Sequence, residues 1–161
     1  MKQLGELTVA DYMTPQAICI EQHSRLTKAI EIMDDQQVSV LPVVDGEGGL
    51  VGILSATDLI EITHEIQADL SGLSKAAPRT RAFLIRLLMD QGDTTLVHDV
   101  MTSGVETTTP QTNLVVAAQK LTDCDYHHLP VMGESGEPIG ILATSDLVRA
   151  MADYGAMMAG P

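Results

Sequence analysis

The sequence predicts an α/β protein of the α+β type, built from two tandem β-α-β-β-α units. Two observations carry this prediction. First, VGILSATDLI at 51–60 reappears as IGILATSDLV at 139–148, and three other landmark pairs are also 88 positions apart without a gap: Pro42 and Pro130, Met13 and Met101, Asp58 and Asp146. Second, short apolar or β-branched runs alternate with segments of helical spacing in the same order in both copies.

Each unit is predicted to open with a helical turn and a strand. VADYMT at 9–14 and VHDVMT at 97–102 have the pattern of a turn that leads into a strand. The strand continues as AICIE at 17–21 in the first copy, and as the Thr-rich VETTT at 105–109 in the second. The β-branched composition of the latter favours a strand.

A helix is expected next in each unit. Apolar residues recur at i, i+3, i+4 and i+7 in both copies, as Leu26, Ala29, Ile30 and Met33 and as Leu114, Ala117, Ala118 and Leu121. Ser24 and Thr112 come just before these faces, and we expect their hydroxyl groups to be the N-caps.

The second half of each unit is predicted to be a hairpin and a closing helix. VSVLPVVD at 38–45 and YHHLPVMG at 126–133 favour strands, and a turn rich in Gly and acidic residues separates each from LVGIL at 50–54 or PIGIL at 138–142. Near-helical spacing then predicts closing helices with apolar faces formed by Leu59, Ile62, Ile66 and Leu73 and by Leu147, Met151, Tyr154 and Met158. Helices on one face of a sheet leave apolar surface that a second copy can cover.

These patterns divide the chain into a first repeat at 1–64, a connector at 65–94, a second repeat at 95–154 and a tail at 155–161. RAFLIRLLMD in the connector predicts a short helix that is apolar nearly all round, and we expect it to be buried against the module or a partner. The tail GAMMAGP is predicted to be frayed, or to continue the last helix to an interface.

Four of the nine basic residues lie in the connector, namely Lys75, Arg79, Arg81 and Arg86. A solvated face is the simplest interpretation of such a cluster. The alternative is a phosphate clamp or a docking surface for an acidic partner.

Composition excludes several classes of function. Nine Lys and Arg against 22 Asp and Glu give a net charge of −13, which disfavours binding to nucleic acids and anionic membranes. Only two cysteines, Cys19 and Cys124, occur, and the chain shows neither a signal-peptide pattern nor a membrane-spanning apolar run. We therefore expect a cytoplasmic protein without membrane insertion.

Polar residues stand where the last predicted strand of the first repeat ends. Ser55 and Asp58 follow the apolar run and lie on the turn into a helix, where free N–H groups and the helix dipole favour a phosphate. The carboxylate of Asp58 has the wrong sign for a phosphate, but it suits the two hydroxyl groups of a ribose. The alternative is that both residues only cap the helix.

The second copy departs from this pattern at one position. Asp146 matches Asp58, but Ala143 replaces the serine, and the adjacent Thr144 is out of register. A lost hydrogen bond to a charged oxygen is worth roughly 1.5 to 3 kcal/mol. We therefore expect the two sites to differ, with the Asp146 side weaker by about tenfold or more.

CDYHH at 124–128 contains four potential metal ligands, Cys124, Asp125, His127 and His128. Consecutive residues on a strand point to opposite faces, so the two histidines cannot chelate one ion. We predict no metal site here.

In this order and twice over, the motifs resemble those of tandem cystathionine β-synthase (CBS) domains, the pair called a Bateman module. The resemblance covers about 8–64 and 96–152 and rests on DYMT and DVMT, LPVVD and LPVMG, and VGILSATD and IGILATSD. It implies two CBS repeats related by a pseudo-twofold axis, with two clefts between their sheets. Relatives bind AMP, ADP, ATP, S-adenosylmethionine or NAD there, usually for regulation, and stand-alone members are commonly homodimers.

The resemblance also assigns roles to residues. In the family pattern G-h-h-[ST]-x-x-D, where h is apolar, Gly52 allows close approach, Ser55 offers a hydroxyl to the phosphate side and Asp58 holds the ribose. Gly140 and Asp146 match this pattern in the second repeat.

Two further groups of residues are implied by the resemblance. His127 and His128 occupy a place where basic residues of relatives approach phosphates, whereas the first repeat has Ser39 and Val40; exposed surface histidines are the alternative. If the contact exists, nucleotide affinity should fall between about pH 6 and 8 as the imidazolium is lost.

The chain has no Trp and one Phe, so we expect an aliphatic slot to hold the adenine. The family pattern implies that this slot is formed by Ala17, Ile18, Val105 and the strand around Val40 and His128. Ordinary core packing is the alternative.

We expect a regulatory module that senses an adenosine nucleotide and needs no cofactor. An enzyme is disfavoured because the sequence has no P-loop, Rossmann fingerprint or activated-nucleophile motif. A ligand bound between the repeats would change their relative orientation, and a regulated enzyme or transporter would respond through different affinities for the two states. The alternative is a dimeric assembly module whose clefts bind no ligand.

Overall fold

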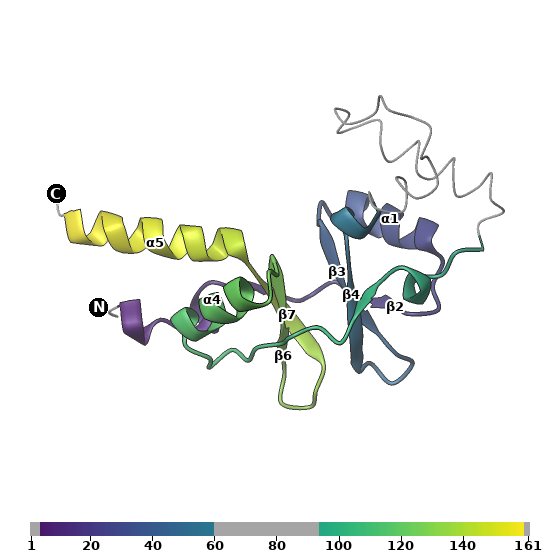
Figure 1. Ribbon diagram of the computed structural model, residues 1–161, viewed down its shortest axis with the longest axis horizontal. Coiled ribbons are helices and arrows are strands. Elements are labelled where there is room, and N and C mark those ends of the chain that lie inside the picture. The colour runs from purple at the N-terminus through teal and green to yellow at the C-terminus, as the bar shows by residue number, and fades with distance from the viewer. Residues whose placement is uncertain (1–3, 60–93, 160–161) are drawn as a thin grey trace, which may run out of the picture. The chain divides into compact units, whose positions relative to one another are not determined.

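The computed structural model describes residues 4–59 and 94–159 (Figure 1) and divides into two compact units. One unit joins Met1–Ala17 to Val105–Pro161, and the other is Ile18–Gly104. The predicted division at 1–64 and 95–154 follows the order of the sequence. The compact units differ from this division at the start of each repeat. Met1–Ala17, at the start of the first repeat, belongs to the unit that contains most of the second, and the segment that ends at Gly104, at the start of the second repeat, belongs to the unit that contains most of the first. We call these two the exchanged segments.

The unit Ile18–Gly104 contains a four-stranded sheet in the order β2-β3-β4-β5. Its strands are β2 Ile20–Glu21, β3 Val40–Val44, β4 Leu50–Ser55 and β5 Thr102–Ser103. β3 and β4 form the predicted hairpin, β2 lies parallel to β3, and β5 pairs antiparallel with β4. The helices are α1 Leu26–Asp35 and η3 Val97–Asp99, and a further helix begins at residue 56.

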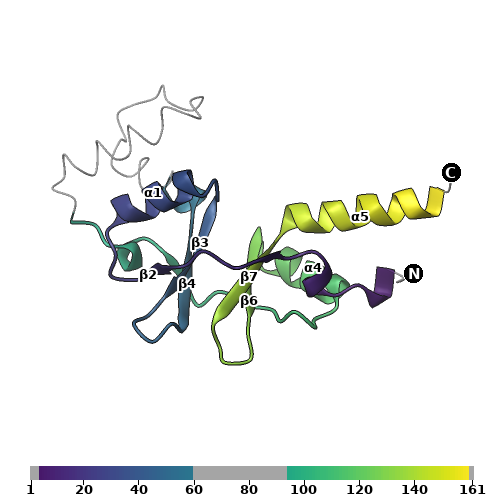
Figure 2. The ribbon, with the colours of Figure 1, turned by 180° about the vertical axis from the view of Figure 1, so that it is seen from behind.

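The other unit contains a three-stranded antiparallel sheet in the order β1-β7-β6. β6 His128–Met132 and β7 Pro138–Ala143 form its hairpin, and β1 Thr14–Pro15 comes from the N-terminal segment. The helices are η1 Leu4–Glu6, η2 Val9–Asp11, α4 Leu114–Asp123 and α5 Thr144–Ala159. Figure 2 shows the N-terminal segment beside α4, where the Leu114 N–H donates to the Leu7 carbonyl at 2.9 Å.

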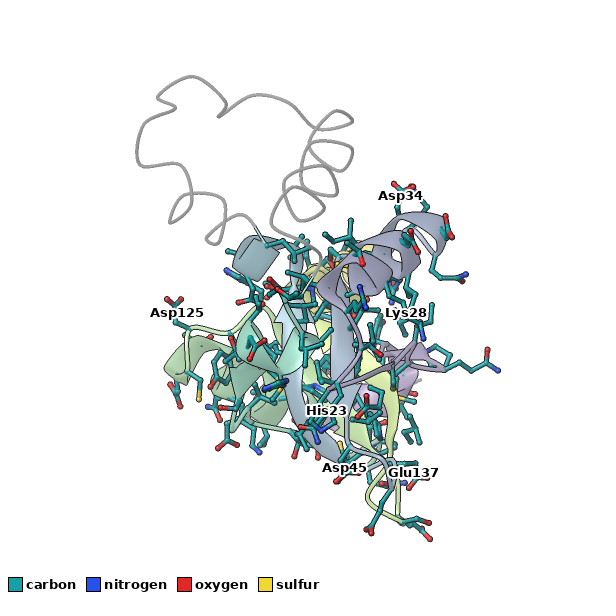
Figure 3. The ribbon with its side chains drawn as sticks, turned by 90° about the vertical axis from the view of Figure 1, so that its right-hand side faces the viewer. His23, Lys28, Asp34, Asp45, Asp125 and Glu137 are labelled. Atoms are coloured by element: carbon teal, nitrogen blue, oxygen red, sulfur yellow. The ribbon has the colours of Figure 1, made fainter. Side chains whose placement is uncertain are left out.

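The predicted apolar faces of the first helices are confirmed, except that Ala118 of α4 is only half-buried. Each unit has its own core, and the buried residues of α1 are Leu26, Thr27, Ala29, Ile30 and Met33, whereas those of α4 are Leu114, Ala117 and Leu121. Lys28 and Asp34 project from the exposed side of α1 (Figure 3), so this helix is amphipathic. α4 differs, because Val115 and Val116 are 44% and 47% exposed on its outer side.

The closing helix of the second repeat follows the predicted face only in part: Tyr154 is half-buried, and the Met158 side chain lies outside the described residues. Met151 is 69% exposed, whereas Ala150 is 1% exposed and Leu147 packs against the core. The buried face of this helix therefore includes Ala150 in place of Met151. α5 also extends through the predicted tail to Ala159, as the alternative for that tail anticipated. In the first repeat Leu59 is buried, while Ile62, Ile66, Leu73 and the connector with its four basic residues lie outside the described residues.

Three local predictions were wrong. The N-caps are Arg25 and Asn113, one residue after Ser24 and Thr112, and the Asn113 side chain accepts from the Val115 N–H at 2.9 Å. The Thr112 hydroxyl instead bonds the Thr109 hydroxyl. The predicted strand at 105–109 is reduced to one bridge between Thr108 and Val131, and the strand at 17–21 to Ile20–Glu21.

Gly52 and Gly140 permit two backbones to approach each other. A Cβ at Gly52 would lie 2.5 Å from the Thr102 carbonyl oxygen, and one at Gly140 would lie 2.7 Å from the Thr14 carbonyl oxygen. Gly52 pairs with Ser103 on β5, and Gly140 pairs with Pro15 on β1. In both units the glycine therefore serves the pairing of an exchanged segment with the last hairpin strand.

Thr108 is a polar residue at a core position. It is 4% exposed and its hydroxyl has no hydrogen-bond partner among the described residues, whereas its counterpart 88 residues earlier, Ile20, belongs to the other core. An unsatisfied buried hydroxyl costs about 1 to 3 kcal/mol.

Thr108→Val removes that hydroxyl without changing the shape of the side chain. We expect the free energy of unfolding to rise by about 1 kcal/mol and the melting temperature by about 2 to 4 °C. Thr109→Val is the control, because its hydroxyl is exposed and bonded to Thr112 at 2.9 Å, so it should give no gain. A lower melting temperature for Thr108→Val would contradict this interpretation.

Candidate functional site

Ser55 and Asp58 form a reciprocal cap at the end of β4. The Asp58 Oδ2 atom accepts from the Ser55 N–H at 2.6 Å and from the Ser55 hydroxyl at 2.7 Å. The Asp58 N–H in turn donates to Ser55 Oγ at 3.3 Å. This is a capping box, so Ser55 and Asp58 do cap the helix that follows. It also fixes the orientation of the Asp58 carboxylate.

The other oxygen of Asp58 is less engaged. Oδ1 accepts a long hydrogen bond of 3.4 Å from the Thr102 hydroxyl on β5, and Asp58 is half-buried. Within the described ranges, no ion pair involves Asp58. Oδ1 therefore retains capacity to accept hydrogen bonds from a ligand.

The N–H groups of this helix turn are partly used within the protein. The Ala56 N–H donates to the Ser39 carbonyl at 2.9 Å, and the Asp58 N–H bonds Ser55 Oγ. The expectation of a phosphate held by free N–H groups is therefore weakened at this turn. The Asp58 Oδ1 atom, with its single long contact from Thr102, is less engaged than these N–H groups.

The second repeat keeps the cap but loses the hydroxyl. The Asp146 Oδ2 atom accepts from the Ala143 N–H at 2.8 Å, the counterpart of the Ser55 bond. Thr144 does not replace the missing hydroxyl, because its Oγ1 and its N–H both donate to the His127 carbonyl, at 3.3 and 3.0 Å.

A residue that the sequence reasoning missed occupies the second oxygen of Asp146. Arg149 Nη2 lies 2.9 Å from Asp146 Oδ1 and donates to the Tyr12 carbonyl at 2.7 Å. The Asp146 side chain is 9% exposed, against 56% for Arg149. A basic residue three positions after an acidic one on a helix is the sequence signal that could have identified this pair.

The two histidines have different environments. His127 is exposed, whereas His128 is half-buried at the start of β6 and pairs with Ala143. Burial lowers the pKa of His128 from its ordinary value, His127 lowers it further, and the charge of Asp146 partly opposes both. Because the pKa of His128 is lowered, any gain in phosphate affinity from its protonation shifts to lower pH than the sequence suggested.

The aliphatic candidates are divided between the units. Val40 is 6% exposed and pairs with Ser55, and Ile18 packs against the core of the same unit. Ala17 and Val105 are half-buried and belong to the other unit. The predicted residues are therefore divided between the units: Ile18, Val40, Gly52, Ser55 and Asp58 lie in one, and Ala17, Val105, His127, His128, Gly140, Thr144 and Asp146 in the other.

Two searches of the described ranges bear on metal and membrane binding. No group of three or more His, Cys, Asp or Glu side chains in those ranges is arranged to hold a metal ion. No helix there is both long enough and apolar enough to cross a membrane.

The family follows from comparison with known proteins. A model of the CBS domain matches residues 9–65 and 97–153, one match for each repeat. The chain therefore belongs to the CBS domain family, and its two domains form a tandem pair.

Particular relatives cover most of this chain. CBS domain-containing protein CBSX2 of Arabidopsis thaliana, a chloroplastic protein, is 30% identical over 152 residues, which span 91% of this chain and 64% of that protein. An uncharacterized protein of Methanocaldococcus jannaschii is 28% identical, with 91% and 93% covered. The crystal structure of CBSX2 in complex with AMP superposes with a TM-score of 0.66 at 29% identity, covering 91% of this chain and 96% of that one.

The lowered pKa of His128 predicts how stability depends on pH. The unfolded chain binds a proton at His128 more readily than the folded protein does, so folding loses stability as pH falls below about 6.5. In His128→Gln, the drop in the free energy of unfolding between pH 7.5 and 5.5 should be smaller than in the wild type. His127→Gln is the exposed control for this comparison by urea denaturation. Equal drops in the wild type and His128→Gln would contradict the prediction.

Proposed function

We propose that the protein is a regulatory module that binds an adenosine-containing ligand through Asp58, and more weakly through Asp146. The observation that carries the proposal is the duplicated strand end, where a carboxylate is held in a fixed orientation by the backbone N–H three residues before it. AMP, ADP and ATP are the first candidates, and S-adenosylmethionine and NAD follow. No catalytic group and no permanently bound cofactor are part of this proposal.

The chemistry of Asp58 supports a ribose as the recognised group. A carboxylate accepts hydrogen bonds from two neighbouring hydroxyl groups, and the capping box already supplies its orientation. Oδ1 carries only the 3.4 Å contact from Thr102, so a ribose diol replaces little when it binds. Support also comes from CBSX2, which is 29% identical and has been crystallised with AMP.

Regulation requires that the ligand prefer one conformational state of the protein. A ligand shifts an equilibrium only by its difference in affinity for the two states. We propose that the ligand-bound state is recognised by a partner, either an enzyme or a transporter, and that the protein acts in the cytoplasm as a homodimer.

A second candidate function is a dimeric assembly module that binds no ligand. The observation in its favour is a set of exposed apolar side chains on the helices of one unit, namely Val115, Val116, Val148 and Met151. Exposed apolar side chains that gather on one surface are typical of interaction sites.

Calorimetric titration with AMP tests the proposed function. We expect wild-type protein to bind AMP, and Asp58→Asn to weaken that binding by about tenfold or more, because a hydrogen bond to a charged oxygen is lost. Asp146→Asn should have the smaller effect. Asp35→Asn, at the exposed end of α1, is the matched control and should bind as the wild type does.

Two further points make the titration decisive. Thermal melting of Asp58→Asn checks that the altered cap still supports folding. Absence of heat with AMP, ADP, ATP and S-adenosylmethionine, in protein shown to be free of nucleotide, would refute ligand binding and favour the assembly module.

A further inference from the structure

We infer that Arg149 couples ligand binding at Asp146 to the N-terminal segment, defined here as residues 4–15. This inference rests on the proposed function and deepens it, because it names a positioning residue and the part of the chain that responds. It concerns one unit only, since Asp146, Arg149 and the N-terminal segment all belong to it.

The geometry begins at the carboxylate. Asp146 Oδ2 is used by the Ala143 N–H, and Oδ1 is used by Arg149 at 2.9 Å. With the Asp146 side chain only 9% exposed, little of its carboxylate is open to a ribose diol while this arrangement persists. A ligand that binds Oδ1 therefore competes with Arg149.

Arg149 has room to withdraw. Its side chain is 56% exposed, so its guanidinium can turn into water without being pulled through the core. Asp146 is buried and its charge is costly to leave unpaired, so the hydroxyl groups of the ligand must replace the guanidinium as donors to the carboxylate.

The same guanidinium nitrogen holds the N-terminal segment. Arg149 Nη2 donates to the Tyr12 carbonyl at 2.7 Å, and the guanidinium carbon lies 5.9 Å from the centroid of the Tyr12 ring. The Tyr12 hydroxyl also bonds Asp153 on the same helix at 3.3 Å. Tyr12 is followed closely by β1 at Thr14, so a change at Tyr12 is transmitted directly to the strand that pairs with β7.

Other contacts confine the response to the end of the segment. The Val9 N–H donates to the Thr112 carbonyl at 2.9 Å and does not involve Arg149. Val9 should therefore stay in place when Arg149 moves, while the turn that follows it, at Tyr12 and Met13, loosens.

The first repeat lacks this device among its described residues. Val100 stands at the position of Tyr12, and Asp58 receives the Thr102 hydroxyl instead of a cation. In the sequence the counterpart of Arg149 is Glu61, which lies outside the described residues. The two strand ends therefore differ in the proposal: ligand binding at Asp146 is coupled to the N-terminal segment, and ligand binding at Asp58 is not.

Amide hydrogen exchange tests the coupling in the full-length protein, with AMP as the probe. The Tyr12 and Met13 N–H groups both donate to the Val9 carbonyl, at 3.1 and 2.8 Å, and report on the turn; the Val9 N–H is the internal reference. Saturating AMP should speed exchange at Tyr12 and Met13 by at least about threefold and leave Val9 unchanged. Arg149→Gln without ligand should show the same increase, and AMP should then add nothing.

Affinity supplies an independent readout. In an Asp58→Asn background, which leaves Asp146 as the ligand site, Arg149→Gln should bind AMP about fivefold more tightly because a competitor for Oδ1 is gone. Lys28→Gln removes an exposed cation from α1 in the other unit and is the charge-matched control for both measurements. It should change neither exchange at Tyr12 nor AMP affinity.

Three results would overturn the inference. AMP binding that leaves Tyr12 and Met13 exchange unchanged would refute the coupling while leaving the proposed function intact. Weaker AMP binding in Arg149→Gln would show that Arg149 assists the ligand and does not compete with it. If no AMP heat appears in the wild type, the proposed function and this inference both fail, and the ligand-free exchange of Arg149→Gln then measures only the structural tie to Tyr12.

Discussion

Both units depend on a close backbone approach at one glycine. At Gly52 and Gly140 the carbonyl oxygen of an exchanged segment lies where a Cβ would be, at 2.5 Å from Thr102 and 2.7 Å from Thr14. Each sheet is completed in this way by a strand that introduces the other repeat. Without this approach, β1 could not pair with β7 and β5 could not pair with β4. Each sheet would then lose one edge strand.

The same exchange brings the functional groups together. Pairing at Gly52 places Thr102 beside Asp58, and pairing at Gly140 places the segment containing Tyr12 beside Arg149 and Asp146. Residues that are distant in the sequence therefore lie beside each carboxylate. The capping hydrogen bonds at both strand ends are common to the two repeats, while the second-oxygen partner differs. That difference is the physical basis on which we propose two unequal ligand sites in a chain made of similar halves.

Much of the fold was predictable because duplication doubles every signal. The hairpins, the buried faces of α1 and α4, and the capped strand ends follow from local patterns that occur twice. The exchange of segments was not predictable from the sequence. Strand pairing at the edge of a sheet is nonlocal, and a two-residue strand such as β1 has too few residues to show a pattern. The bond from Arg149 to Tyr12, 137 positions away in the chain, could not be predicted, although the spacing of Arg149 from Asp146 was a local signal. The strand prediction at 105–109 was too long, because only Thr108 pairs with β6, at Val131.

The central claim is that the glycines are required by backbone pairing of the exchanged segments, and the free energy of unfolding of Gly140→Ala tests it most directly. Gly46→Ala is the comparison, because a Cβ there meets nothing within 4 Å. The account predicts a loss of about 2 kcal/mol or more for Gly140→Ala, since the Thr14 backbone must move, against a change within about 0.5 kcal/mol for Gly46→Ala. Equal, small changes in the two variants would contradict it and would show that β1 does not pack closely on β7 in solution.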